Sequence, residues 1–129
     1  MNKEDYVSLE VAKLLKEKGF DEDCMAFYTR DGLFECNSYI NTNVLKHPTP
    51  TLYEAQKWLR DRHKIHISVG MCSDYSTNAD GDICDEWTFW TFSTYYTTNL
   101  HHRHDCFGEY DTYEEALNTG ILEALKLIE

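Results

Sequence analysis

The stretch that most constrains the fold is TYEEALNTGILEALKLI, residues Thr112–Ile128. Its apolar residues recur at helical spacing, so they predict a helix with one buried stripe. The stripe consists of Leu117, Ile121, Ala124, Leu125 and Ile128. Thr112 followed by Glu115 has the spacing of a capping box, which marks the start of the helix. Gly120 costs about 1 kcal/mol relative to alanine inside a helix, so we expect another element to pack closely against it.

Two earlier segments carry similar signals for the start of a helix. Ser8 precedes a run whose apolar residues share one helical face, and Gly19 follows that run as a stop signal. Thr51 and Glu54 repeat the capping-box spacing directly after Pro50, which disfavours helix upstream of it. The sequence therefore predicts three helices.

Four runs with the composition or alternation of β-strands lie between these helices. They cover residues 24–29, 33–39, 65–71 and 87–96. Arg30-Asp31-Gly32 joins the first two runs as a hairpin turn, and Asp80-Gly81 is a turn signal between the last two. We predict an α+β fold in one domain, residues 1–129, with the order α-ββ-α-ββ-α. The sheet is expected to be antiparallel, with about four strands and helices packed mainly on one face.

The composition limits the classes of partner and compartment. Twelve Lys and Arg against 23 Asp and Glu give a formal charge of −11 on 129 residues, which opposes binding to nucleic acid and to anionic membranes. No stretch approaches the roughly 18 apolar residues of a membrane span, and the first residues do not resemble a signal peptide. Five cysteines without a CxxC spacing fit reduced thiols, so we expect a cytoplasmic protein.

The charge is distributed unevenly along the chain. Residues 74–86 contain five acids and no Lys or Arg, and residues 105–129 contain seven acids and one Lys. The middle helix and its exit, in contrast, carry Lys57, Arg60, Arg62 and Lys64. The acidic segments could imitate a nucleic-acid backbone and occupy the basic groove of a DNA-binding protein. The alternative interpretation is that the charge provides solubility. The basic end of the middle helix is a candidate contact for an acidic partner, including a second copy of the chain.

Three segments together resemble a family of small uncharacterised proteins from gut bacteria and their phages. The matching segments are Tyr6–Phe20, then Pro50–Arg60 with His63–Ile67, and Tyr113–Leu117 with Leu122–Ile128. They cover about one-third of the chain and almost all of its predicted helix. The resemblance implies that these elements form the scaffold and carries no activity. Features specific to this protein are then expected within residues 21–47 or 70–110.

The run of residues 87–96 places large aromatic rings on both faces of a strand. The candidate interface residues are Trp87, Phe89, Trp90, Phe92, Tyr95 and Tyr96. If helices cover one face of the sheet, the other aromatic face is left for a partner, and a self-complementary dimer is one such arrangement. Coverage by the first helix or a long loop is the alternative. Base stacking is a third reading, which the charge opposes.

The segment His101–Cys106 contains candidate metal ligands. In an extended conformation His102, His104 and Cys106 point the same way, and these residue types bind Zn²⁺ and related metals. They would need help from elsewhere, for which His63 and His66 are candidates. The alternative is a polar loop with solvated imidazoles.

Residues 76–83 are similar to the front of a calcium loop. Asn78 and Asp80 fall at ligand positions, and Asp82 could supply oxygens in another arrangement. The twelfth position holds Trp87 instead of the expected glutamate, so the alternative is an ordinary Asp-Gly hairpin turn. We therefore expect no resident cofactor, with zinc and calcium as the ions to test.

Enzyme signatures are missing from the sequence. It contains no GxSxG, phosphate-binding loop or HExxH, and a Cys106–His104 pair alone lacks an indicated oxyanion site. The leading interpretation is a small acidic, non-catalytic protein that binds another protein, with itself as one candidate, through an aromatic sheet face. A metal-binding protein and an acidic mimic of nucleic acid are the two alternatives.

Overall fold

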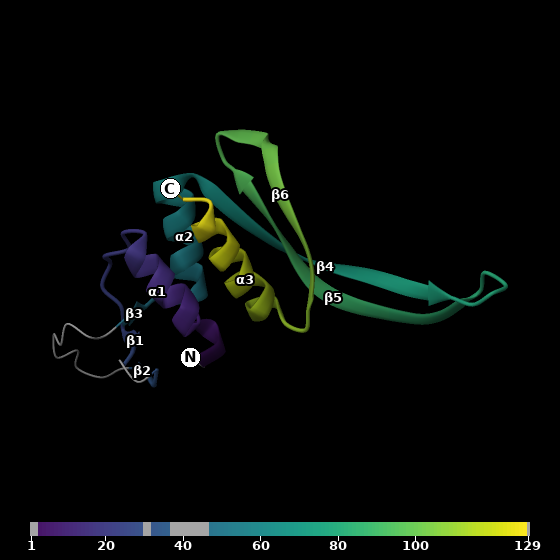
Figure 1. Cartoon of the computed structure of the whole chain (residues 1–129), viewed down its shortest axis with the longest axis horizontal. Helices are drawn as coiled ribbons and strands as arrows, with labels where there is room; N and C mark the ends of the chain where they lie inside the picture. Colours follow the sequence, from purple (N-terminus) through teal and green to yellow (C-terminus); the bar gives the residue numbers. More distant parts are fainter. Residues whose placement is uncertain (1–2, 30–31, 37–46, 129) are drawn as a thin grey trace.

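The computed structural model describes residues 3–29, 32–36 and 47–128, with the backbone alone for residues 36 and 99–107. Figure 1 shows its helices and strands. The helices are η1 (Lys3–Asp5), α1 (Leu9–Glu17), α2 (Leu52–His63) and α3 (Tyr113–Lys126). The strands are β1 (Ala26–Tyr28), β2 (Phe34–Cys36), β3 (His47–Thr49), β4 (Ile65–Thr77), β5 (Ile83–Tyr96) and β6 (Asn99–Tyr110).

The three α-helices begin where the capping residues predict. The Ser8 hydroxyl accepts a hydrogen bond from the backbone N–H of Val11, and the Thr112 hydroxyl accepts one from that of Glu115. At Thr51 both halves of the capping box are formed, each with a donor–acceptor distance of 3.1 Å to Glu54. Side-chain oxygens thereby satisfy backbone N–H groups that have no partner inside the helix.

The strands form two sheets rather than the single sheet of about four strands that the sequence predicts. One sheet has the order β2-β1-β3 and the other the order β4-β5-β6, and all pairs are antiparallel. Both predicted hairpins exist, and Gly32 and Gly81 have positive φ in their turns. The expected order was incomplete because β3 and β6 were not predicted. β3 is a short segment containing Pro48, and β6 lacks a run of apolar alternation.

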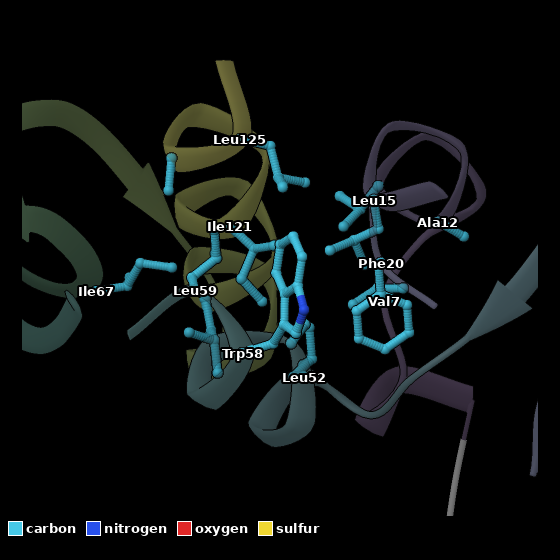
Figure 2. Packing of buried hydrophobic residues seen from close by; sticks show 14 of the residues in the cluster. Val7, Ala12, Leu15, Phe20, Leu52, Trp58, Leu59, Ile67, Ile121 and Leu125 are labelled. Atoms are coloured by element: carbon cyan, nitrogen blue, oxygen red, sulfur yellow. The ribbon is translucent and has the colours of Figure 1, made fainter. Parts of the chain in front are cut away.

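The core lies among the three helices and the near half of the β4-β5-β6 sheet. Figure 2 shows side chains from α1, α2 and α3 meeting in one interior, and the rings of Phe20 and Trp58 pack edge to face there. On the sheet side, Ile67 and Phe92 are buried against α3. The predicted close approach at Gly120 is confirmed, because a Cβ there would lie 2.7 Å from Cγ2 of Ile67.

The β4-β5 hairpin extends far beyond the helices. β5 pairs with β6 only from Trp90 onward, so residues 71–89 form a two-stranded ribbon, which we call the arm. Figure 1 shows the arm projecting away from the rest of the molecule. At about 3.3 Å per residue, its β4 half from Met71 to Thr77 spans roughly 20 Å.

Among the described residues, no helix has the length and apolar character that crossing a membrane requires.

Candidate functional site

The arm has two faces with different neighbours. Residues that are directly opposed on β4 and β5 share a face. Met71 is opposite Trp90, whereas Cys72 is opposite Phe89 and Asp74 is opposite Trp87. Met71 and Trp90 continue the face that α3 covers further along the sheet, whereas Trp87 and Phe89 lie on the opposite face. This separation of Trp87 and Phe89 from Trp90 agrees with the strand alternation in the sequence.

Large apolar side chains are exposed along the arm on both strands. The exposed fractions are 58% for Met71, 58% for Tyr75, 56% for Ile83 and 40% for Trp87. An isolated two-stranded ribbon is at best marginally stable in water, and exposed apolar surface of this kind marks interaction sites. The arm is therefore the candidate functional site.

The six aromatic residues predicted as an interface lie in different environments. Trp87 is exposed, and Phe89 and Trp90 are partly buried. Phe92 is only 2% exposed and belongs to the core, so it cannot line a binding surface. Tyr96 packs against the core, and Tyr95 lines a shallow pocket of about 340 Å³ on the opposite face of the sheet.

Two contacts fix the base of the arm to the body. The Trp87 indole N–H donates to Oε1 of Glu109 at 3.2 Å, and the Trp90 ring packs edge to face on Tyr113 at 5.5 Å. Tyr113 also lines a hollow of about 550 Å³ between the first turns of α2 and α3, together with the exposed Tyr53. The apolar surface thus continues from the arm across Trp90 and Tyr113 onto the helices.

The arm carries only negative formal charge. Its acids are Asp74, Asp80, Asp82, Asp85 and Glu86, and there is no Lys or Arg between Lys64 and Arg103. All five carboxylates are on exposed residues. Since no cation lies on the arm to neutralise them, the ribbon presents a negative potential around its apolar side chains.

The turn at the tip of the arm is organised by Asn78. Its Oδ1 accepts the backbone N–H of Asp80 at 2.9 Å and that of Asp82 at 3.0 Å. The backbone N–H of Asn78 also donates to the carbonyl of Asp82 at 2.9 Å. The oxygen proposed as a cation ligand is thus already bound to N–H groups, as in an ordinary hairpin turn. Cation binding by Asn78, Asp80 and Asp82 stays a prediction.

The metal prediction falls on residues whose side chains are not described. His102, His104 and Cys106 lie within β6, outside the described side chains, so their metal binding also stays a prediction. Among the side chains that the structure describes, no three His, Cys, Asp or Glu residues are grouped to hold a metal ion. Of the proposed helpers, His63 packs edge to face on Trp58, with ring centroids 4.8 Å apart.

His66 lies at the start of β4, next to the basic end of α2. Burial, and secondly the charge of Arg60, lower the pKa of His66, and its buried Nδ1 has no hydrogen-bond partner among the residues that the structure describes. For His63, burial and then Arg62 lower the pKa in the same way. Both effects favour the neutral imidazole.

The described cysteine thiols are free and differ in accessibility. Burial, followed by the charges of Glu54, Glu22 and Asp23, raises the pKa of Cys24 to about 12. Cys72 and Cys84 are exposed on the arm. The arm thiols are therefore the accessible ones, and Cys24 is protected as a neutral thiol.

Sequence reasoning missed the outer part of the arm, which consists of β4 beyond Met71 and the start of β5 at Ile83. The sequence predicts a strand that ends at Met71, and it places Tyr75 and Ile83 in no helix or strand. A signal was present, because Tyr75 continues the alternation that begins at Ile65. The serine, aspartate and glycine residues that follow Met71 obscured it, since these residues are typical of turns.

When the chain is compared with protein families, curated proteins and solved structures, none of them matches.

Proposed function

We propose that this protein is a non-catalytic binding protein whose arm docks on a basic surface of another protein. The observation that carries the proposal is the arm itself, a projecting ribbon with exposed apolar side chains and five carboxylates but no Lys or Arg. A basic groove that encloses the ribbon would bury Met71 and Tyr75 on one face and Trp87 on the other, and these are residue types enriched in interface cores.

The charges of the arm supply specificity and a fast encounter. A cluster of like charge steers a complementary basic surface toward it and disfavours acidic partners and nucleic acid. The mimic of nucleic acid is a special case of this proposal, in which the basic surface is a nucleic-acid-binding groove. We place the interaction in the cytoplasm, a proposal that the free thiols of Cys72 and Cys84 support.

The test is affinity capture with the full chain and two variants of equal charge. The arm-neutralised variant and the control variant each remove four negative charges, which takes the formal charge from −11 to −7. The arm-neutralised variant carries Asp80→Asn, Asp82→Asn, Asp85→Asn and Glu86→Gln. The control variant carries Glu17→Gln, Asp21→Asn, Glu22→Gln and Asp23→Asn, at exposed positions at and after the end of α1.

We expect a basic protein that the wild-type chain and the control variant capture and that the arm-neutralised variant loses. Trp87→Ala should lose the same protein, because truncating a partly exposed interface tryptophan removes buried apolar contact. If the arm-neutralised variant and the control variant lose the captured protein equally, then the net charge of the chain, and not the arm, explains the capture. Capture that survives both the arm neutralisation and Trp87→Ala would refute the proposal.

A further inference from the structure

The outer edge of β4 has no strand beside it among the described residues. β4 is the edge strand of the β4-β5-β6 sheet, and its register with β5 is regular from Ile65 to Ser76. The carbonyl of Lys64 accepts from Thr97 on the β5 side, and that of Ile67 accepts from Nε2 of Gln56 at 2.8 Å on the outer side. Because hydrogen-bonding direction alternates along a strand, the odd-numbered residues of β4 direct their N–H and C=O groups outward.

Beyond Gln56 this outer edge is almost entirely unpaired. It consists of the backbone groups of Val69, Met71, Ser73 and Tyr75. The N–H of Tyr75 donates to the carboxylate of Asp74 at 2.8 Å, an exposed bond between neighbouring residues. No hydrogen bond within the described structure engages the N–H or C=O groups of Val69, Met71 and Ser73. Such an edge is a template for another strand, and Asp74 is its single charged residue.

The charges at the two ends of β4 are opposite. Arg60, Arg62 and Lys64 stand before its first residue, and Asp80 and Asp82 lie in the turn beyond its last. Within the described part of the chain, Arg60 and Arg62 have no ion pair. β4 has 13 residues, which at about 3.3 Å each separates its ends by roughly 40 Å. Figure 1 shows α2 and the tip of the arm at opposite ends of this strand.

One copy of the chain cannot bring these opposite charges together, but two antiparallel copies can. If β4 lies against β4 of a second copy with the direction reversed, the acidic turn of each copy runs toward the basic end of α2 in the other. Both attractions form at once, and the acidic turns of the two copies lie at opposite ends of the pair. A strand edge that is complementary to itself in this way is typical of a two-fold symmetric interface.

We infer that the protein self-associates through antiparallel pairing of β4 with β4 of a second copy, which joins the two three-stranded sheets into one. The register between the two β4 strands follows from the positions of the four outward-facing residues, Val69, Met71, Ser73 and Tyr75. A two-fold axis at Cys72 places Val69 opposite Tyr75 of the second copy and Met71 opposite its Ser73, so all outward residues find partners. Shifting the axis by one residue in either direction leaves at least one of these four outside the mutual pairing.

This inference concerns the edge of the arm, whereas the proposed function concerns its faces and its charge. The pairing leaves Trp87 and both faces of the ribbon exposed, so a dimer can still bind a basic partner. The two proposals can therefore succeed or fail separately. A Ser73→Pro variant would have a weakened dimer yet retain Trp87 and all five arm acids for the capture experiment.

The position of the axis provides a test by disulfide formation. Opposed residues in a non-hydrogen-bonded antiparallel pair have Cα atoms about 4.5 Å apart, within the range that a disulfide spans. Mild oxidation of the full chain with copper phenanthroline should therefore produce a cross-linked dimer through Cys72, detected by non-reducing electrophoresis. Cys72→Ser should abolish it. Cys84→Ser is the matched control and should retain it, because Cys84 is also exposed but lies on β5, away from the paired edge.

The second test measures the dimer without cross-linking, by sedimentation equilibrium. Ser73→Pro removes an outward N–H while leaving the bonds to β5, and we expect its dimer dissociation constant to rise about tenfold or more, because symmetry removes two donors at once. Ser73→Ala should leave the constant unchanged. A wild-type monomer at millimolar concentration, or a cross-link that persists in Cys72→Ser, would overturn the inference. Equal dissociation constants for Ser73→Pro and Ser73→Ala would overturn it as well.

Discussion

Replacing Gly120 by alanine tests how closely α3 approaches the sheet. Gly120 is buried in the middle of α3, where alanine would gain about 1 kcal/mol in helix propensity. An added Cβ, however, would lie 2.7 Å from Cγ2 of Ile67 and 3.1 Å from Cδ2 of Phe92. Carbon atoms in contact prefer about 3.5–4.0 Å, so the first distance is short by roughly 0.8 Å.

The close approach should outweigh the propensity gain. Overpacking a well-packed core costs about 1–3 kcal/mol, and both neighbours are themselves buried, which leaves them little room to move. After the propensity gain of about 1 kcal/mol is subtracted, we expect Gly120→Ala to lower the free energy of unfolding by about 1 kcal/mol, within a range of roughly 0–2. The assay is urea denaturation followed by circular dichroism, which gives this free energy directly.

A double-mutant cycle locates the cause. Ile67→Ala removes the Cγ2 atom and should cost about 2–5 kcal/mol alone, but adding Gly120→Ala to it should cost less than in the wild-type chain, because the space is now free. A Gly120→Ala variant more stable than the wild type would refute the reasoning. Strictly additive effects of the two substitutions would show that Ile67 is not the obstacle.

Three further perturbations test the capping, the buried thiol and the imidazole next to α2. Thr51→Ala should lower the free energy of unfolding by about 1 kcal/mol in urea denaturation, because alanine lacks the hydroxyl that accepts the backbone N–H of Glu54. The pKa of Cys24 is raised from 9.0 to about 12, so its contribution to stability is present below pH 9 and is lost as the pH rises toward 12. Urea denaturation should show this alkaline loss in the wild type and a smaller one in Cys24→Ala. Burial and Arg60 lower the pKa of His66, so its contribution is present above pH 6.5 and is lost as the pH falls through the lowered pKa. In an NMR titration Arg60→Gln should move the pKa of His66 upward, and an unchanged value would contradict the assignment of Arg60 as a cause.

Local signals in the sequence predicted the helices and the turns. Ser8, Thr51 and Thr112 cap the three helices because capping depends on atoms within three residues of each other. Gly32 and Gly81 mark the two hairpin turns for the same reason, since a positive φ is a local requirement that glycine meets. The close packing at Gly120 was also predictable, because glycine is costly inside a helix unless something needs the space.

The division into two sheets was not predictable in this way. Pairing of β1 with β3 joins Ala26 to Thr49, and pairing of β5 with β6 includes two register shifts. Contacts of this kind depend on the position of distant segments, and β6 in addition lacks the apolar alternation that marks a strand. The sequence therefore predicted the two hairpins but not β3 and β6, the strands that complete the two sheets.

By itself, the sequence determined that this is an acidic α+β protein with three capped helices and antiparallel hairpins, because these properties follow from composition and from short-range hydrogen bonding. Only the tertiary structure decided which part of the second hairpin is covered. Alternation along a strand does not reveal which part of the strand the helices cover. The sequence therefore predicted both Phe92 and Trp87 as interface residues. Burial under α3 places Phe92 in the core, whereas Trp87 lies on the arm, where β5 is no longer paired with β6 and the indole stays exposed. The candidate function rests on that difference.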